Sequence, residues 1–190
     1  MSNWDDVAER VVFNLEISVP DFQSAVPLKS KILDFGCGYG RVTNQLYGLG
    51  FRDLIGVDAS ESMICRGLNA FPTLDLRHLS DLPLPFPDQS FDAVITCAVF
   101  TCVPDQTERV KILDELHRVL KPNGVLYLAE FCSDDGHKFT SGMGVSMWHS
   151  QPKVIEGMLT SFEVELLKAV QSPTMSGHFS EAIHILARKN

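Results

Sequence analysis

The sequence lacks any apolar run of the roughly 18 residues that a membrane-spanning helix needs, so we expect no such helix. Its first residues include acidic side chains and lack the basic-then-apolar layout of a secretory signal. Basic residues form no run and the net charge is −8, which argues against a partner with a phosphate backbone. We therefore expect a cytoplasmic protein that binds neither membrane nor nucleic acid and is a monomer or a homodimer.

The number of cysteines is odd, and none of them form the C-x-x-C spacing of a zinc or redox site. There are five of them, namely Cys37, Cys65, Cys97, Cys102 and Cys132. We interpret them as reduced thiols in a cytoplasmic protein, with neither a disulfide framework nor a metal site.

The composition that remains is ordinary for a folded protein. Hydrophobic residues make up 45% and charged residues 21% of the 190 residues, which is enough to bury a full α/β core. We expect residues 1–190 to form a single domain.

A glycine-rich stretch, K-I-L-D-F-G-C-G-Y-G-R from Lys31 to Arg41, organises the chain. Its opening apolar run predicts a buried parallel strand over 32–35. Three glycines follow at alternate positions, where the absence of a Cβ allows positive φ and the close approach of a ligand. Apolar residues at helical spacing then predict a helix that begins near Gly40 or Arg41. This order of elements is typical of a nucleotide-binding unit, although a tight turn without a ligand would look similar.

The spacing of the glycines discriminates among nucleotides. A dinucleotide fingerprint needs its third glycine at the position of Arg41, so a nicotinamide oxidoreductase is disfavoured. Asp34 lies two residues before the first glycine, where it would repel a pyrophosphate but suit an ammonium group. Asp58 ends the next predicted strand, 53–58, where a carboxylate can accept from both hydroxyls of a ribose.

Strands and helices continue to alternate along the rest of the chain. Ser60 and Asp105 each precede a helical pattern as N-cap residues. The prolines within 80–92 preclude regular structure, so this stretch must be a loop. Further strands are expected over 74–78, 91–96, 125–131, 162–169 and 182–189, with a short helix over 154–159.

Residues 30–131 resemble the class I S-adenosylmethionine (SAM)-dependent methyltransferases. The resemblance rests on D-F-G-C-G-Y-G, on L-P-F-P-D-Q-S-F-D from Leu84, and on L-H-R-V-L-K-P-N-G-V-L from Leu116. It implies a three-layer, Rossmann-like α/β sandwich. Its seven-stranded, mostly parallel sheet would have the order 3-2-1-4-5-7-6, with the last strand antiparallel. The implied cofactor is SAM, and S-adenosylhomocysteine (SAH) is the product.

The resemblance also implies where each part of the cofactor binds. Asp34 would favour the ammonium, the backbone at 36–38 the methionine part, and the helix N-terminus the carboxylate. Asp58 would bind the ribose, while Asp81 and Leu82 would hold the edge of the adenine. The implied cofactor-binding residues are Asp34, Gly36, Cys37, Gly38, Gly40, Asp58, Ala59, Met63, Asp81, Leu82 and Cys97.

The segments expected at the acceptor side carry few motifs. Residues 1–30 predict an N-terminal cap helix, which either covers the core or closes over the acceptor pocket, and then a loop through Pro20 and Pro27 into the first strand. Residues 132–150 show no periodicity and are interpreted as a lid loop at the acceptor site. His149 in this loop and Tyr39 in the glycine turn are candidate catalytic residues, and His178 in a later turn is a further candidate.

We predict an enzyme that transfers a methyl group from SAM to a small-molecule acceptor by in-line displacement onto an O, N, S or C nucleophile. No Asn-Pro-Pro-Tyr-like sequence follows the fourth strand, which favours a small acceptor. A dedicated general base is not obligatory, because the cofactor carries the activated group. Two alternatives stay open: a non-catalytic SAM-binding sensor or partner subunit, and a methyltransferase of protein or RNA.

Overall fold

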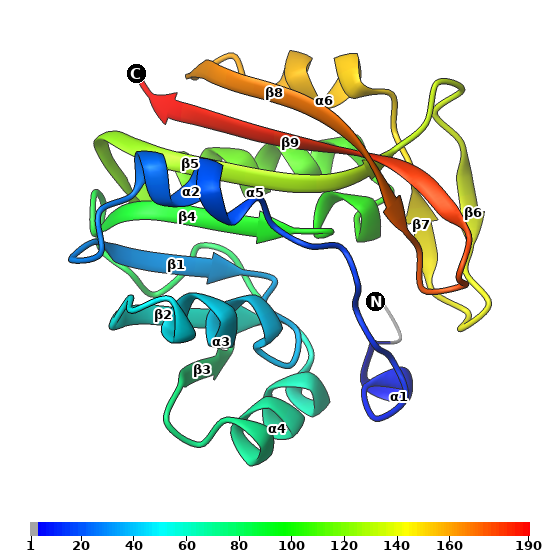
Figure 1. Cartoon of the computed structure of the whole chain (residues 1–190), viewed down its shortest axis with the longest axis horizontal. Coiled ribbons are helices and arrows are strands. Elements are labelled where there is room, and N and C mark those ends of the chain that lie inside the picture. The colour runs from blue at the N-terminus through cyan, green and yellow to red at the C-terminus, as the bar shows by residue number, and fades with distance from the viewer. Residues whose placement is uncertain (1–3) are drawn as a thin grey trace.

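The computed structural model describes residues 4–190, which form a central sheet covered by helices on both faces (Figure 1). The sheet has seven strands in the order β3-β2-β1-β4-β5-β9-β8. Its strands are β1 (Lys31–Phe35), β2 (Asp53–Asp58), β3 (Asp75–His78), β4 (Phe91–Cys97), β5 (Leu120–Cys132), β8 (Phe162–Pro173) and β9 (Phe179–Lys189). A separate two-stranded sheet pairs β6 (Lys138–Thr140) with β7 (Ser146–Trp148).

The expected strand order is confirmed once β6 and β7 are left out of the count. The sixth and seventh strands of the main sheet are then β8 and β9, and β9 runs antiparallel to both β5 and β8. The first five strands are parallel, and Asp34 of β1 lies opposite Gly56 of β2 and Ile95 of β4. Their carboxyl ends therefore meet at one edge of the sheet, where ligands bind in open α/β folds.

The sheet divides the apolar core into two layers, and helices cover each layer. Apolar side chains of α2 (Val19–Ala25) and α3 (Arg41–Gly48) pack on one face of the sheet, and those of α5 (Gln106–Val119) and α6 (Pro152–Met158) pack on the other. Figure 1 shows α2 and α3 on the near side and α5 behind the strands. The remaining helices are α1 (Trp4–Val7), α4 (Glu61–Ala70) and the 3-10 helix η1 (Phe100–Cys102).

The expected helix caps are confirmed. The Ser60 hydroxyl accepts a hydrogen bond from the Met63 amide at 3.1 Å, and α4 begins at the next residue. The Asp105 carboxylate accepts one from the Glu108 amide at 3.0 Å at the start of α5. Each cap satisfies a backbone donor that the first turn of a helix leaves without a partner.

The prediction of one N-terminal cap helix is wrong. After α1 the chain turns at residues 8–10 and then runs extended as far as α2. The Arg66 guanidinium donates to the carbonyl oxygens of Ala8 (2.6 Å) and Val11 (2.7 Å), and these contacts stabilise the non-helical path of the chain. The amide of Ser18 donates to the Tyr127 hydroxyl at 2.7 Å. We call residues 11–18 the N-terminal strap; part of the cap prediction, residues 1–3, lies outside the described residues.

Three other expectations need correction. Residues 132–150 are not a structureless loop, because they contain the β6–β7 hairpin. Pro20 lies in the first turn of α2 and not in a loop, which is a position where proline is tolerated. Strands β5, β8 and β9 are longer than expected, since backbone pairing between β8 and β9 extends into polar segments with weak apolar alternation.

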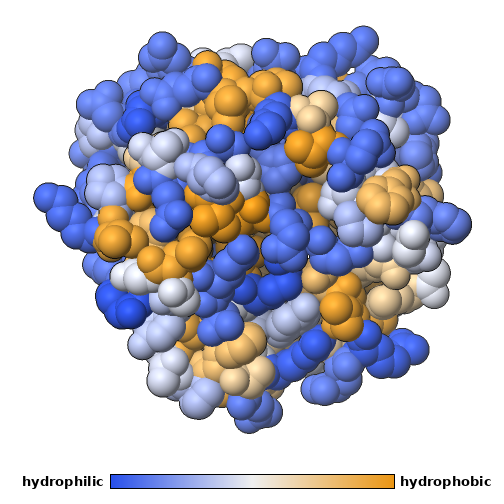
Figure 2. Space-filling model, viewed as in Figure 1, coloured by the Kyte–Doolittle hydropathy of each residue, from blue (hydrophilic) through white to orange (hydrophobic). Residues whose placement is uncertain are grey.

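Apolar side chains on the face shown in Figure 2 are gathered in separate patches between polar ones, as on most folded proteins. Within residues 4–190, no helix is both long and apolar enough to cross a bilayer.

Candidate active site

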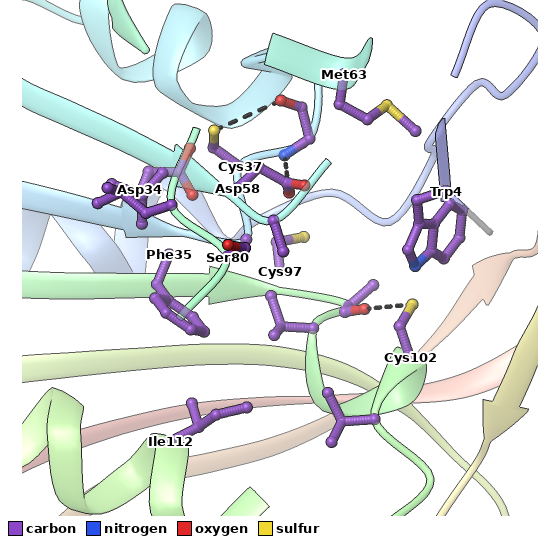
Figure 3. Close-up of a pocket in the computed structure, with 18 of the residues that line it drawn as sticks. Trp4, Asp34, Phe35, Cys37, Asp58, Met63, Ser80, Cys97, Cys102 and Ile112 are labelled. Carbon is purple, nitrogen blue, oxygen red and sulfur yellow. Dashed lines mark hydrogen bonds between the residues drawn. The ribbon is translucent and has the colours of Figure 1, made fainter. Parts of the chain in front are cut away.

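A cavity of about 280 Å³ opens at the carboxyl ends of β1, β2 and β4. Figure 3 shows Trp4 and Met63 on one side of it and Phe35 and Ile112 on the other, with Asp58 between them. The parallel strands end here, so the backbone of the glycine turn and the carboxylates of Asp34 and Asp58 border the cavity together with mainly apolar side chains.

Asp58, the last residue of β2, is held by two backbone donors. Its carboxylate accepts a hydrogen bond from the amide of Gly38 and another from the amide of Ser60, both at 2.8 Å. Burial raises the pKa of this carboxyl, and the two amide donors act in the opposite direction. The side chain borders the cavity with its orientation fixed, so it can accept from a ligand without first reorganising.

Asp34 contributes a second carboxylate to the same cavity. The Thr43 hydroxyl, from the first turns of α3, donates to it at 2.6 Å. Burial raises its pKa to about 6, because the charged form loses hydration that one hydroxyl does not replace. A cationic ligand group beside Asp34 would restore the charged form.

The glycine turn leaves no room for side chains at its first two glycines. Gly36 has a φ of +71°, and a Cβ there would lie 2.4 Å from a methyl group of Val99. Gly38 has a φ of +55°, and its Cβ would lie 2.7 Å from the Phe13 ring. The bare backbone therefore forms the cavity wall at these positions.

We expect Gly36→Ala to lower the free energy of unfolding by about 2 kcal/mol, since the left-handed conformation and the Val99 contact both penalise a methyl group. The matched control is Gly48→Ala at the end of α3, where a Cβ meets nothing within 4 Å. This control should be neutral or stabilising by up to about 1 kcal/mol. Urea denaturation of both variants measures the difference, and equal stabilities would contradict the strain argument.

Arg41 begins α3 and lies where the cavity meets the N-terminal strap. Its guanidinium donates to the carbonyl oxygen of Leu15 and pairs with the Glu16 carboxylate at 3.3 Å. Its Nε is buried and has no hydrogen-bond partner among residues 4–190. An unpaired buried donor is costly, so this cation is suited to receive an anionic group of a ligand.

The thiols that border the cavity are poor bases. Burial raises the pKa of Cys97 to about 12 and raises that of Cys102 further, so both are neutral at physiological pH. Cys37 is buried in the glycine turn, and its thiol lies 3.5 Å from the carbonyl oxygen of Gly38.

Most of the residues expected to bind the cofactor do line the cavity. They are Asp34, Gly36, Cys37, Gly38, Asp58, Ala59, Met63, Asp81, Leu82 and Cys97. Gly40 is the exception: it is the N-cap of α3, with a φ of +79°, and a Cβ there would meet Leu76 at 2.8 Å. Glycine is thus required at this position for packing against β3, not for contact with the cavity.

The candidate catalytic residues are not among the residues that line the cavity. Tyr39 stacks on Phe13 with ring centroids 5.4 Å apart, and Arg66 covers its ring at 3.9 Å. His149 is buried against Phe131, and burial with the nearby His137 lowers its pKa to about 4. His178 is exposed in the turn before β9. The side chains of Tyr39 and His149 are both packed against other residues outside the cavity. Neither is therefore placed to accept a proton from a ligand in the cavity.

Several lining residues were missed by the sequence argument. Trp4 and Phe13 come from α1 and the N-terminal strap, and Val99 and Cys102 come from the segment around η1. The sequence shows only that Trp4 and Phe13 are aromatic residues near its start. It shows that Val99 and Cys102 follow soon after the end of β4. The sequence pattern places Arg41 at the start of a helix and outside a dinucleotide fingerprint, but it does not indicate that the guanidinium borders the cavity.

A buried polar network positions η1 at the edge of the cavity. The Glu130 carboxylate, at the end of β5, accepts from the amides of Val99 (3.0 Å), Phe100 (3.1 Å) and Thr101 (2.8 Å) and from the Thr101 hydroxyl (2.8 Å). The fully buried Arg109 of α5 donates to the carbonyl oxygen of Val103 at 2.7 Å. It also donates to the Ser150 hydroxyl at 3.0 Å, so α5, η1 and the end of the hairpin segment form one unit.

Comparisons with known proteins agree with this geometry. A family model described as a methyltransferase domain matches residues 33–128. The chain is 31% identical over 129 residues to N-demethylindolmycin N-methyltransferase from Streptomyces griseus, covering 66% of this chain and 53% of that protein. It is also 31% identical over 106 residues to the human eEF1A lysine and N-terminal methyltransferase, covering 50% of this chain and 15% of that protein. The chain thus spans about half or less of these relatives' lengths.

Among solved structures, a SAM-dependent methyltransferase from Methanosarcina mazei superposes with a TM-score of 0.83 at 24% identity. The match covers 92% of this chain and 99% of that one, which shows a shared fold. The family match spans just over half of the chain and includes the glycine turn, Asp34, Asp58 and β4. The chain therefore belongs to the methyltransferase-domain family, the class I SAM-dependent methyltransferases.

Proposed function

We propose that this chain transfers a methyl group from SAM to a small-molecule acceptor. The observation that carries the proposal is the fixed Asp58 carboxylate at the rim of the cavity, next to the glycine turn, where Gly36 and Gly38 carry no side chain. A ribose diol can donate two hydrogen bonds to such a carboxylate, and an extended ligand can then lie against the bare backbone.

The cavity's polar groups fit the remaining parts of SAM. Arg41, with its unpaired buried Nε, would hold the carboxylate of the methionine part, and Asp34 would pair with its ammonium. Met63 would pack on the adenine, and Asp81 and Leu82 would border its edge. The carboxylate and the ammonium of the methionine part would thus each have a partner of opposite sign at the cavity wall.

The residues act mainly by position in this scheme. SAM supplies a methyl group already activated on a sulfonium, for in-line displacement by a nucleophilic O, N, S or C atom. The glycine turn, with the Phe13 ring packed on it, and Asp58 hold one side of the cavity fixed, while Trp4 and Cys102 would help to exclude water from the acceptor. The neutral thiols and the remote imidazole of His149 support no dedicated general base.

Two observations bear on the acceptor. Residues of the N-terminal strap and η1 border the side of the cavity to which we assign the acceptor, which suits a small molecule, and the Streptomyces relative is named for one. The human relative is named for a lysine of a protein, which makes a protein acceptor the second candidate. An extended polypeptide would need the strap to move aside.

Transfer of label from methyl-labelled SAM into an extract of the source organism, followed by separation by size, tests the proposal. Label in the small-molecule fraction supports it and leaves a compound to identify by mass. Label in the macromolecular fraction would favour the protein acceptor. Binding of SAM without transfer would support a non-catalytic sensor or partner subunit.

The pairing of Asp34 with the ammonium predicts a pH dependence. The pKa of Asp34 in the free protein is raised to about 6, so the stability it contributes is present below its ordinary pKa and lost as pH rises through about 6. Binding of the ammonium requires the ionised form. Affinity for SAM should therefore fall by roughly tenfold between pH 7 and pH 5.

Calorimetric titration at several pH values measures this dependence. Asp34→Asn should bind SAM more weakly at pH 7 and show a flatter pH profile, because its amide does not titrate. A variant profile as steep as that of the unmodified protein would show that another group is responsible.

A further inference from the structure

A second, smaller cavity of about 30 Å³ adjoins the first on the side of the N-terminal strap. Residues that line both cavities are Trp4, Phe13, Arg41, Cys97, Ala98 and Cys102. We call the smaller cavity the strap subsite. A space of this size holds a group of only a few heavy atoms, so it suits one end of a molecule whose remainder lies in the larger cavity.

The residues that line the strap subsite but not the larger cavity come from segments that carry no family motif. Asn14 and Leu15 come from the N-terminal strap, Phe131 from β5, Met147 from β7 and Met175 from the β8–β9 connection. These walls are apolar except for Asn14, and thioethers adapt readily to flat or irregular apolar groups. The subsite therefore favours an apolar group over a hydrated one.

Asn14 is the polar exception among these lining residues, and the oxygen of its side-chain amide lacks a hydrogen-bond donor within the described part of the chain. Its Oδ1 is buried and has no hydrogen-bond partner among residues 4–190. An unpaired buried carbonyl oxygen costs about 1–3 kcal/mol, and a ligand N–H or O–H group in the adjoining subsite would remove that cost.

Charge further limits the occupant. The guanidinium of Arg41 borders the strap subsite, and its neighbour Glu16 is largely exposed, with its side chain 68% accessible. A cationic group in the subsite would meet this guanidinium in an apolar setting, which is unfavourable. The occupant is therefore not a cation, and because the SAM carboxylate takes the open Nε of Arg41 in the proposed function, a neutral group fits the subsite best.

We propose that the strap subsite, given the methyl-transfer function proposed above, binds the apolar end of a neutral acceptor that donates an N–H or O–H hydrogen bond to Asn14 Oδ1. Asn14 then selects the acceptor without taking part in the transfer itself. The acceptor class is a small, largely apolar molecule with at least one such donor.

The test uses the protein saturated with SAH and two matched probe pairs, phenol with anisole and indole with 1-methylindole. Each pair differs by one O–H or N–H group replaced with a methylated atom. Ligand-observed NMR titration should show phenol and indole binding at least about fivefold more tightly than their methylated partners, as expected of one net hydrogen bond. Asn14→Leu, which keeps the volume and removes the amide, should abolish this preference.

The variants separate recognition from a structural role. Asn14→Leu should leave SAH affinity unchanged and should not lower the melting temperature, because it removes an unsatisfied polar group. Asn14→Asp, which keeps an accepting oxygen, should retain the preference for phenol and indole. Gln45→Leu is the matched control: it removes another buried, unpaired amide oxygen, on α3 and outside both cavity linings, and should alter neither preference nor affinity.

Two outcomes would overturn the inference. One is an unmodified protein that binds both members of each pair equally, and the other is a preference that persists in Asn14→Leu. Failure of SAH to bind the unmodified protein by calorimetry would be a separate result, because it contradicts the proposed function before the probes are added.

Discussion

Replacing Asp58 with alanine should weaken the binding of both SAM and SAH by at least about 100-fold, measured by isothermal titration calorimetry. The carboxylate would accept two hydrogen bonds from the ribose, and hydrogen bonds to a charged group contribute about 1.5–3 kcal/mol each. The same carboxylate holds the amides of Gly38 and Ser60 at 2.8 Å, so its loss also frees the glycine turn. The lost hydrogen bonds to the ribose and the freed glycine turn should both weaken the binding of SAM and SAH.

The matched control is Asp53→Ala, which removes an exposed acid at the opposite end of the same strand. It changes the net charge by the same amount and should leave the affinity within about twofold, because exposed charges that far from a ligand are screened by salt. Near-normal affinity in Asp58→Ala would refute the assignment of the ribose to this carboxylate. A loss of affinity in both variants would show a general charge effect.

Replacing Glu130 with alanine should lower the free energy of unfolding by on the order of 4 kcal/mol, since a fully buried carboxylate disappears and leaves its donors without partners. Three amides of η1 and its flanks would be affected. For a domain of this size the melting temperature should fall by about 10 °C. SAH should also bind more weakly, because Val99 and Cys102 of the cavity wall lose their support.

Glu165→Ala serves as the control for Glu130. Glu165 pairs with Arg188 at 2.6 Å, but its side chain is 39% accessible, so its loss should cost less than about 1 kcal/mol. Calorimetric melting of both variants makes the comparison. Equal, small losses would show that the network around Glu130 does not position η1. The conservative Glu130→Gln should fall between the two, because it keeps one accepting oxygen.

Local sequence alone predicted the cofactor half of the site. A short apolar run, alternate glycines and a helical pattern each depend on neighbours within a few residues, so β1, the glycine turn and α3 could be inferred from periodicity and from positive φ. The acid at the end of β2 follows from the same strand pattern. The parallel sheet then brings Asp34 and Asp58 to one edge whatever the remainder of the chain does.

The part of the cavity that we propose for the acceptor depends on contacts between residues far apart in the chain. Arg66, 58 residues from Ala8 in the sequence, donates to the carbonyl oxygen of Ala8 just before the strap, and the Tyr127 hydroxyl, 109 residues beyond Ser18, accepts from the Ser18 amide at the end of the strap. Helical periodicity over 1–30 could not reveal partners at such distances. For the same reason Tyr39 and His149, chemically reasonable as bases, proved to be packed outside the cavity.

Sequence by itself thus determined the family, because its motifs have a fixed spacing along the chain, and the resemblance to that family implied the strand order. The cofactor-side residues are likewise implied by the resemblance and stay predictions. Only the tertiary structure decided that Gly40 serves packing, that Glu130 holds η1, and that Asn14 is left with a buried oxygen beside the strap subsite. Burial and unsatisfied hydrogen bonds are properties of the assembled core, and no local pattern of residues encodes them.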